Sequence, residues 1–150
     1  MPQAFVDTNI LLYSVDARYP RERALAQALI RELSPSGELV ISSRVLSRVC
    51  AVIRRGKLPD ASVAMDLTSY IGTLCATAKV VDVTARVVAD AVRIGVNHGM
   101  SHYDALILAA AVSAGCGGIY TDDLQSAPAI GGIRYTDPVT QASDDWERPA

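Results

Sequence analysis

The 150-residue chain is poor in aromatic residues, which make up 5% of it, and it has only three cysteines. A core with few aromatic rings has to be built from Val, Ile, Leu and Ala, a mixture that suits a parallel sheet covered by helices. The cysteines, Cys50, Cys75 and Cys116, lie far apart and form no C-x-x-C pair, which argues against a disulfide framework or a zinc site. We expect each of them to be a small buried apolar residue.

The chain also lacks a strong net charge and a long apolar run. Its formal net charge is -2 and its pI is about 5.6, so it is not a strongly basic nucleic-acid-binding protein, although one face could still be basic. The most apolar stretch, ALILAAAV, is too short to cross a membrane, and the first residues do not read as a signal peptide. These absences predict a protein of a reducing, cytoplasmic setting with no membrane partner.

What the sequence does contain is a regular alternation of strands and helices. Short apolar or β-branched segments predict strands at residues 4–6, 38–42, 78–84, 117–121 and 131–138. Segments with helical spacing predict helices over residues 10–16, 21–33, 44–55, 60–74, 85–96 and 104–114. This alternation predicts one three-layer α/β/α sandwich with a central, mainly parallel sheet over residues 1–140, followed by a polar C-terminal tail at residues 141–150.

Several carboxylates lie where predicted strands and helices meet. Asp7 follows the first strand, Asp122 and Asp123 follow the fourth, and Asp104 opens the apolar helix that leads into the fourth. The carboxyl ends of parallel strands form one edge of the sheet, where ligands of such folds bind. Carboxylates gathered there would repel one another without a cation, and oxygen ligands suit Mg²⁺ or Mn²⁺. The sequence therefore predicts a divalent-ion site at this edge.

Each of these residues also has an ordinary explanation. Asp7 could start a turn and Asn9 could cap a helix. Ser101 and Asp104 match a capping box, and Asp122-Asp123 could be a loop pair; taken alone, these explanations are the better ones for Asp104 and for the pair. They give no reason, however, for all the acids to fall at one edge of one sheet.

The order of four stretches carries a family resemblance over residues 4–138: FVDTNILLY, ISSRVLSRVCAVIRRGK, SHYDALILAAAVSAGC, and IYTDDLQ followed by IGGIRYTDP. Together they resemble the PIN-domain ribonucleases, and specifically the VapC-like toxins of bacterial toxin–antitoxin pairs. The resemblance implies a PIN-like α/β/α fold and metal-dependent cleavage of RNA, with Mg²⁺ or Mn²⁺ as cofactor. It also implies a homodimer and a cognate, VapB-like antitoxin that covers the acidic groove.

The resemblance also implies roles for individual residues. Asp7, Asp104 and Asp123 match catalytic acids that hold the metal ion. Asn9 matches a polar residue that supports the first acid, and Thr121 matches a hydroxyl residue near the last. Asp122 lies where relatives often carry another acid, and as a candidate for the site it ranks below Asp123.

One position departs from the family pattern. The family usually has a Glu in the second-segment helix, and the matching residue here is Arg48, whose guanidinium cannot be deprotonated. Arg48 could pair with Asp7 or Asp104 and displace the metal, which predicts a weak or inactive enzyme. It could instead hold an RNA phosphate while three acids still bind one ion. From the sequence alone, a solvated surface charge is the simplest explanation of Arg48.

Two alternatives to an active nuclease follow from the sequence. The first is a catalytically silent PIN-fold module that only binds antitoxin or RNA, and Arg48 motivates it. The second is a phosphotransfer domain of the phosphatase or receiver type, which the absence of a D-x-D-x-T start disfavours.

Basic residues on the same predicted helix or just after it could contact RNA: Arg44, Arg54, Arg55 and Lys57. Basic residues at the end of a helix also complement its dipole, and this explanation of Arg54, Arg55 and Lys57 is at least as good.

Overall fold

Five parallel strands form the centre of the molecule. The computed structural model describes residues 3–56, 66–123 and 130–139. Within these ranges the sheet has the order β3-β2-β1-β4-β5, and all four neighbouring pairs are parallel. The strands are β1 (Ala4–Val6), β2 (Leu39–Ser42), β3 (Lys79–Val81), β4 (Gly118–Tyr120) and β5 (Arg134–Thr136). The five predicted strands are therefore confirmed.

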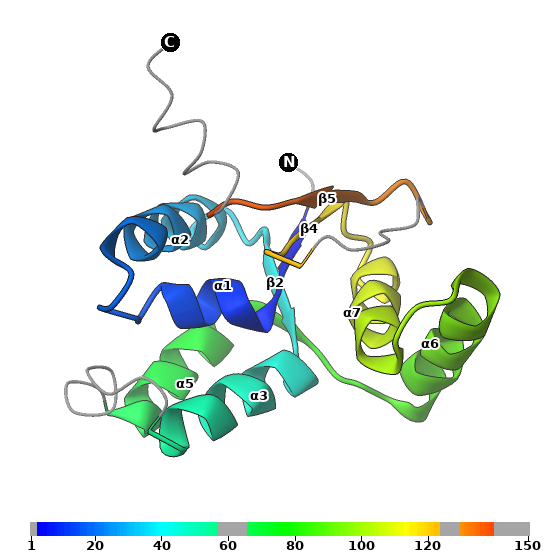
Figure 1. Ribbon diagram of the computed structural model, residues 1–150, viewed down its shortest axis with the longest axis horizontal. Coiled ribbons are helices and arrows are strands. Elements are labelled where there is room, and N and C mark those ends of the chain that lie inside the picture. The colour runs from blue at the N-terminus through cyan, green and yellow to red at the C-terminus, as the bar shows by residue number, and fades with distance from the viewer. Residues whose placement is uncertain (1–2, 57–65, 124–129, 140–150) are drawn as a thin grey trace, which may run out of the picture.

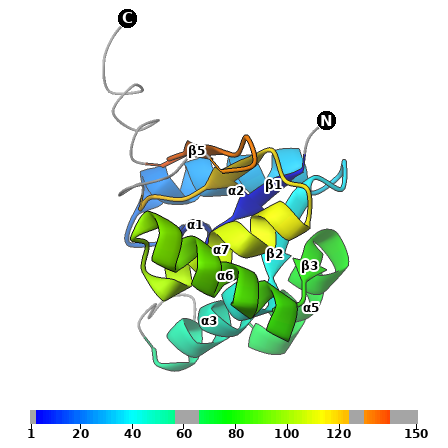
Figure 2. The same cartoon turned by 90° about the vertical axis from the view of Figure 1, so that its right-hand side faces the viewer.

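Helices cover both faces of this sheet. They are α1 (Thr8–Tyr13), α2 (Pro20–Leu33), α3 (Ser43–Arg54), α5 (Leu67–Thr77), α6 (Ala85–His98) and α7 (His102–Ser113). Figure 1 shows α6 and α7 on one side of the sheet and α1, α2 and α5 on the other. In Figure 2, α6 and α7 lie in front of the sheet, packed against each other. The predicted three-layer α/β/α sandwich is confirmed.

The core is aliphatic, as the composition predicts. The single Phe of the chain, Phe5, is fully buried in β1 beside Val6, and Leu39, Val40 and Ile41 of β2 are equally buried. Burying one such side chain contributes about 1.5–3 kcal/mol, so the two central strands are strongly anchored. The fixed centre of the sheet determines where the residues after β1 and β4 emerge.

Side chains at the helix ends explain where several helices begin. Ser42 caps α3 by accepting a hydrogen bond from the Val45 N–H, and Thr84 caps α6 by accepting one from the Val87 N–H. The cap of α1, however, is Asp7 rather than Asn9, because the Asp7 Oδ1 accepts a bond of 2.6 Å from the Thr8 N–H. The expectation of an Asn9 cap is therefore wrong.

Other expectations are corrected or lie outside the described residues. The helix predicted to end near Leu74 continues to Thr77, and its described part begins after the cap Asp66. The expected polar tail and the start of that helix fall outside the described residues.

The expectation that all three cysteines are buried holds only for one of them. Cys116 is buried, but Cys50 is half-buried and Cys75 is exposed; all three are free. Burial raises the pKa of the Cys116 thiol to about 11, so this residue stays protonated. Across the ranges that the structure describes, no helix is both long and apolar enough to span a bilayer.

Candidate active site

The ends of β1 and β4 bring two polar side chains together. Val6 of β1 lies opposite Tyr120 of β4, so the residues that follow, Asp7 and Thr121, leave the sheet side by side. The Asp7 N–H donates to the Tyr120 carbonyl at 3.0 Å, and the Thr121 Oγ1 donates to the Asp7 Oδ2 at 2.9 Å. The same Thr121 oxygen accepts a bond of 3.1 Å from the Asp123 N–H. Thr121 thus fixes the Asp7 carboxylate and the backbone of Asp123 relative to each other.

Asp7 is a largely buried carboxyl group. Burial raises its pKa above the ordinary value of 3.8, while the hydrogen bonds from Thr8 and Thr121 lower it. The negative charges of Asp122 and Asp104 raise it further. A partly desolvated carboxylate beside two other acids is the environment in which a cation relieves the repulsion.

The backbone N–H of Asp104 takes part in the N-terminal cap of α7, and its carboxylate is left available for another contact. The Ser101 Oγ accepts a hydrogen bond of 3.2 Å from the Asp104 N–H, which is one half of the expected capping box. Within the described residues, the Ser101 N–H does not donate a hydrogen bond to the Asp104 carboxylate, which would be the other half of the box. The capping explanation and a ligand role of Asp104 are therefore compatible.

The three acids predicted as metal ligands line one small space, which we call the acid hollow. Asp7, Asp104 and Asp123 form its polar wall together with Thr121 and Tyr135. Its volume of about 20 Å³ corresponds to roughly one water-sized sphere. In the described ranges, no group of three His, Cys, Asp or Glu side chains is already arranged to hold a metal ion. The metal role of these acids therefore stays a prediction.

Tyr135 lines the acid hollow and has no role in the sequence prediction. Its hydroxyl is buried and has no hydrogen-bond partner among the described residues. Burial, and then the charge of Asp104, raises the pKa of Tyr135, so the hydroxyl is protonated and able to donate. A buried donor without a partner in a polar hollow fits a bound water or the hydration shell of an ion. The only signal in the sequence was its place in the stretch GGIRYTDP.

Asn9 and Asp122 form a separate contact at the rim. The Asn9 Nδ2 donates to the Asp122 Oδ1 at 3.1 Å. Asn9 was expected to support Asp7, but within the described residues its side chain is hydrogen-bonded to Asp122 instead. Asp122 does not line the acid hollow, which agrees with its lower rank beside Asp123.

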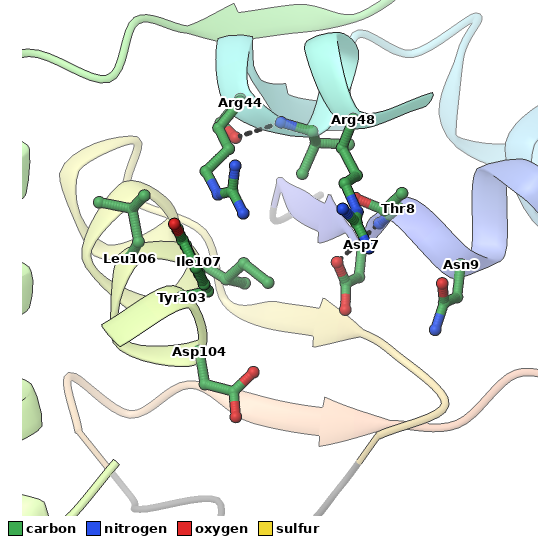
Figure 3. Close-up of a pocket in the computed structure, with 11 residues that line it drawn as sticks. Asp7, Thr8, Asn9, Arg44, Arg48, Tyr103, Asp104, Leu106 and Ile107 are labelled. Carbon is green, nitrogen blue, oxygen red and sulfur yellow. Dashed lines mark hydrogen bonds between the residues drawn. The ribbon is translucent and has the colours of Figure 1, made fainter. Parts of the chain in front are cut away.

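A larger space of about 310 Å³, which we call the basic pocket, adjoins the acid hollow. It lies between the N-terminal ends of α1, α3 and α7 (Figure 3). Asp7 and Asp104 line both spaces. The basic pocket is lined by Asp7, Thr8, Asn9, Ser42, Arg44, Val45, Arg48, Tyr103, Asp104, Leu106 and Ile107.

The two arginines of the basic pocket come from the first turns of α3. Figure 3 shows Arg48 extending from α3 toward Asp7 and Arg44 extending toward Tyr103. The Arg44 guanidinium carbon lies 3.8 Å from the centroid of the Tyr103 ring. Arg48 forms no ion pair with a carboxylate in the part of the chain that the structure describes. It lines the basic pocket but not the acid hollow.

The remaining basic residues lie away from the two spaces. Arg54 and Arg55 are exposed at the C-terminal end of α3. Ten residues separate Arg54 from Arg44, which corresponds to about 15 Å along the helix axis. Lys57 lies outside the described residues. Of the three predicted RNA-binding residues that the structure describes, Arg44, Arg54 and Arg55, only Arg44 lines the basic pocket.

Several solved structures are similar to this fold. A toxin–antitoxin complex from Klebsiella pneumoniae is 18% identical, with a TM-score of 0.65 over 91% of this chain and 98% of that chain. VapC20 of Mycobacterium tuberculosis, described as a Sarcin-Ricin loop cleaving toxin, is 21% identical, with a TM-score of 0.59 over 82% and 92% of the two chains. FitAcB from Neisseria gonorrhoeae is 19% identical, with a TM-score of 0.64 over 91% and 98%. At these identities the likeness establishes the fold alone.

Comparison of the sequence with models of known protein families identifies the family. A search of curated proteins finds no match. The family model described as PIN domain matches residues 4–129, which include β1 and the acids after β4. Because this match spans most of the chain, the protein belongs to the PIN domain family.

Proposed function

We propose that this PIN-domain protein is a Mg²⁺- or Mn²⁺-dependent endoribonuclease of the toxin–antitoxin type. The observation that supports it best is the meeting of Asp7, Asp104 and Asp123 at one hollow of about 20 Å³. The family membership and the similarity to toxin structures agree with a nuclease. The carboxylates would hold the ion, and neighbouring side chains would orient them.

The residues around the ion would have distinct tasks. A bound divalent ion lowers the pKa of a coordinated water and polarises the scissile phosphate. The Thr121 hydroxyl keeps the Asp7 carboxylate oriented by donating to its Oδ2. The Tyr135 hydroxyl is free to donate to a water or a phosphate oxygen in the hollow.

Arg48 would act on the substrate rather than on the acids. Its place in the basic pocket, outside the acid hollow and without a carboxylate partner among the described residues, supports this role. A guanidinium binds phosphate oxygens through parallel hydrogen bonds. Arg48 would then hold an RNA phosphate while the three acids bind one ion.

The similar structures support proposals for the antitoxin and the substrate of this chain. The similar structures include toxin–antitoxin complexes and VapBC bound to DNA, which supports a VapB-like antitoxin for this chain. One similar protein is described as a toxin that cleaves the Sarcin-Ricin loop, which supports RNA as the substrate. A homodimer is proposed on the family resemblance.

A cleavage assay tests the proposal. The protein is incubated with structured RNAs and Mn²⁺, and the reaction is repeated with EDTA and with Asp7→Asn. We expect cleavage that both changes abolish. Cleavage that persists in EDTA and in the variant would rule out the proposed mechanism.

The silent binding module is the second candidate. Two points favour it: by the family resemblance, Arg48 matches a position where the family usually has Glu, and the described residues contain no ready three-ligand group. Calorimetric titration with Mn²⁺ separates the two candidates. Binding that Asp7→Asn abolishes supports the nuclease, whereas absence of binding supports the silent module.

A further inference from the structure

The contact between Arg44 and Tyr103 has no part in the metal chemistry. Tyr103 is a large apolar side chain that is 58% exposed, although it lines the basic pocket. Arg44 comes from α3 and Tyr103 from α7, so the pair joins two helices across the mouth of the pocket. An exposed ring that is held in place at a polar pocket is a candidate contact for a ligand.

Arg44 and Tyr103 together form a flat surface whose orientation is set before a ligand binds. The Arg44 guanidinium carbon lies 3.8 Å from the centroid of the Tyr103 ring, well inside the distance at which a cation is attracted to an aromatic face. The guanidinium thus restrains the orientation of a ring that remains accessible to solvent. Nucleobases stack both on aromatic rings and on guanidinium planes in single-stranded RNA recognition.

The rest of the basic pocket has the composition of a nucleotide site. Val45, Leu106 and Ile107 provide apolar surface, and Arg44 and Arg48 provide positive charge beside the negative charges of Asp7 and Asp104. Its volume of about 310 Å³ is at the small end of the range for sites that bind small molecules. This volume suits one nucleotide, whereas a base inside a duplex is stacked and paired and does not reach such a pocket.

The pocket also lies directly beside the predicted reaction centre. Asp7 and Asp104 line both the basic pocket and the acid hollow. A nucleotide in the basic pocket would therefore have its phosphate next to the acids. The chain can hold a base and present the adjoining phosphate in one continuous site.

We propose that the basic pocket binds one unpaired nucleotide of the RNA, next to the scissile phosphate. Its base stacks on the Tyr103 ring that Arg44 restrains, and Arg48 contacts its phosphate. This inference rests on the proposed function, and it assigns Tyr103 and Arg44 as the residues that position the substrate beside the acids.

Binding without cleavage tests the inference. Fluorescence anisotropy is measured in EDTA with a labelled RNA of mixed sequence, either alone or annealed to its complement. The variants are Tyr103→Leu, which removes the aromatic face, and Tyr103→Phe, which keeps it. Tyr19→Leu is the matched control, because Tyr19 is 46% exposed and also lies under an arginine, Arg18, at 5.5 Å, but does not line the pocket.

We expect Tyr103→Leu to weaken single-strand binding roughly tenfold or more, the effect of losing one stacked base. Tyr103→Phe and Tyr19→Leu should stay within about twofold of the wild type, since the stack is kept or untouched. The duplex should bind more weakly and respond little to Tyr103→Leu. Circular dichroism melting confirms that each variant is folded.

Three results would overturn the inference. The first is unchanged single-strand affinity in Tyr103→Leu, as expected if the pocket accepts a peptide of a partner protein instead. The second is an equal loss in Tyr103→Phe, which would assign the effect to the hydroxyl group. The third is a duplex that binds as tightly as the single strand. Since the assay contains EDTA, a missing nuclease activity would not imitate any of these results.

Discussion

The acid hollow and the basic pocket share three residues, Asp7, Asp104 and Ile107, and differ in size and in the rest of their lining. The volume of the hollow is about 20 Å³ and that of the pocket about 310 Å³. The hollow is lined mainly by residues in or just after β1, β4 and β5 together with Asp104 and Ile107 of α7, whereas the pocket is formed mainly by the first turns of α1, α3 and α7. The sheet edge sets the positions of two proposed ion ligands, Asp7 and Asp123, while α7 contributes the third, Asp104, and α3 contributes the two arginines of the basic pocket.

The largest expected effect comes from removing Asp7. We predict that Asp7→Asn lowers RNA cleavage by more than about 100-fold, because it removes a charged ligand rather than a supporting residue. The measurement is the initial cleavage rate in Mn²⁺. Asp90→Asn is the matched control, since Asp90 pairs with Arg86 and Arg93 on the surface of α6. Equal rates in the two variants would contradict the assignment of Asp7.

Removing the Tyr135 hydroxyl should have the next largest effect. Tyr135→Phe is expected to lower the cleavage rate roughly 10- to 100-fold, as for other groups that support a metal site. Its stability should be unchanged or slightly higher, because a buried hydroxyl without a partner is removed. Kinetics and thermal melting provide both values. Tyr120→Phe is the control, because Tyr120 lines a different pocket with Glu32 and Arg134. A Tyr135→Phe variant with full activity would exclude Tyr135 from the site.

Replacing Arg48 with Glu should strengthen ion binding in the acid hollow and weaken RNA binding in the basic pocket. Arg48→Glu places a carboxylate beside Asp7, so we expect tighter Mn²⁺ binding together with weaker RNA binding. Arg48→Gln should weaken RNA binding for all sequences and reduce the salt dependence by about 0.7, the value for one phosphate of a single strand. Calorimetry and anisotropy measure these effects.

Arg54→Glu is the control for position 48, since Arg54 lies at the far end of the same helix and is exposed. If Arg48→Glu changes neither Mn²⁺ nor RNA affinity, the assignment of position 48 to the site is wrong.

The smallest expected effect is on the free energy of unfolding of the metal-free protein. Burial raises the pKa of folded Asp7 above 3.8, so the folded state binds the proton more tightly than the unfolded state does. The wild type should therefore lose stability relative to Asp7→Asn as the pH rises from 3.8 through this raised pKa, and the difference should persist at neutral pH. Urea denaturation in EDTA across this pH range measures the difference. A wild type more stable than Asp7→Asn at neutral pH would contradict the burial of the charge, and added Mn²⁺ should narrow the difference.

The elements of the sheet could be predicted from the sequence because their signals are local. Each strand is a short apolar or β-branched segment, and parallel strands place their carboxyl ends at one edge. This reasoning locates Asp7 and Asp123 near each other.

The contacts between distant segments could not be predicted in this way. Arg44 and Tyr103 meet because α3 and α7 approach each other at their N-terminal ends, which no local pattern reports. The Asn9 bond to Asp122 spans 113 residues. Tyr135 lies in a matched stretch, but only the packing of β5 beside β4 places it at the acid hollow. The gathering of the acids at one edge of the sheet could thus be predicted, whereas the contact between Arg44 and Tyr103 and the place of Tyr135 could not.

The account depends most on one divalent ion in the acid hollow. A crystal soaked in Mn²⁺ and measured at a wavelength where manganese scatters anomalously tests this directly. We predict a single anomalous peak in contact with Asp7, Asp104 and Asp123, with the Arg48 guanidinium remaining in the basic pocket. An empty hollow, with Arg48 paired to Asp7, would contradict the account.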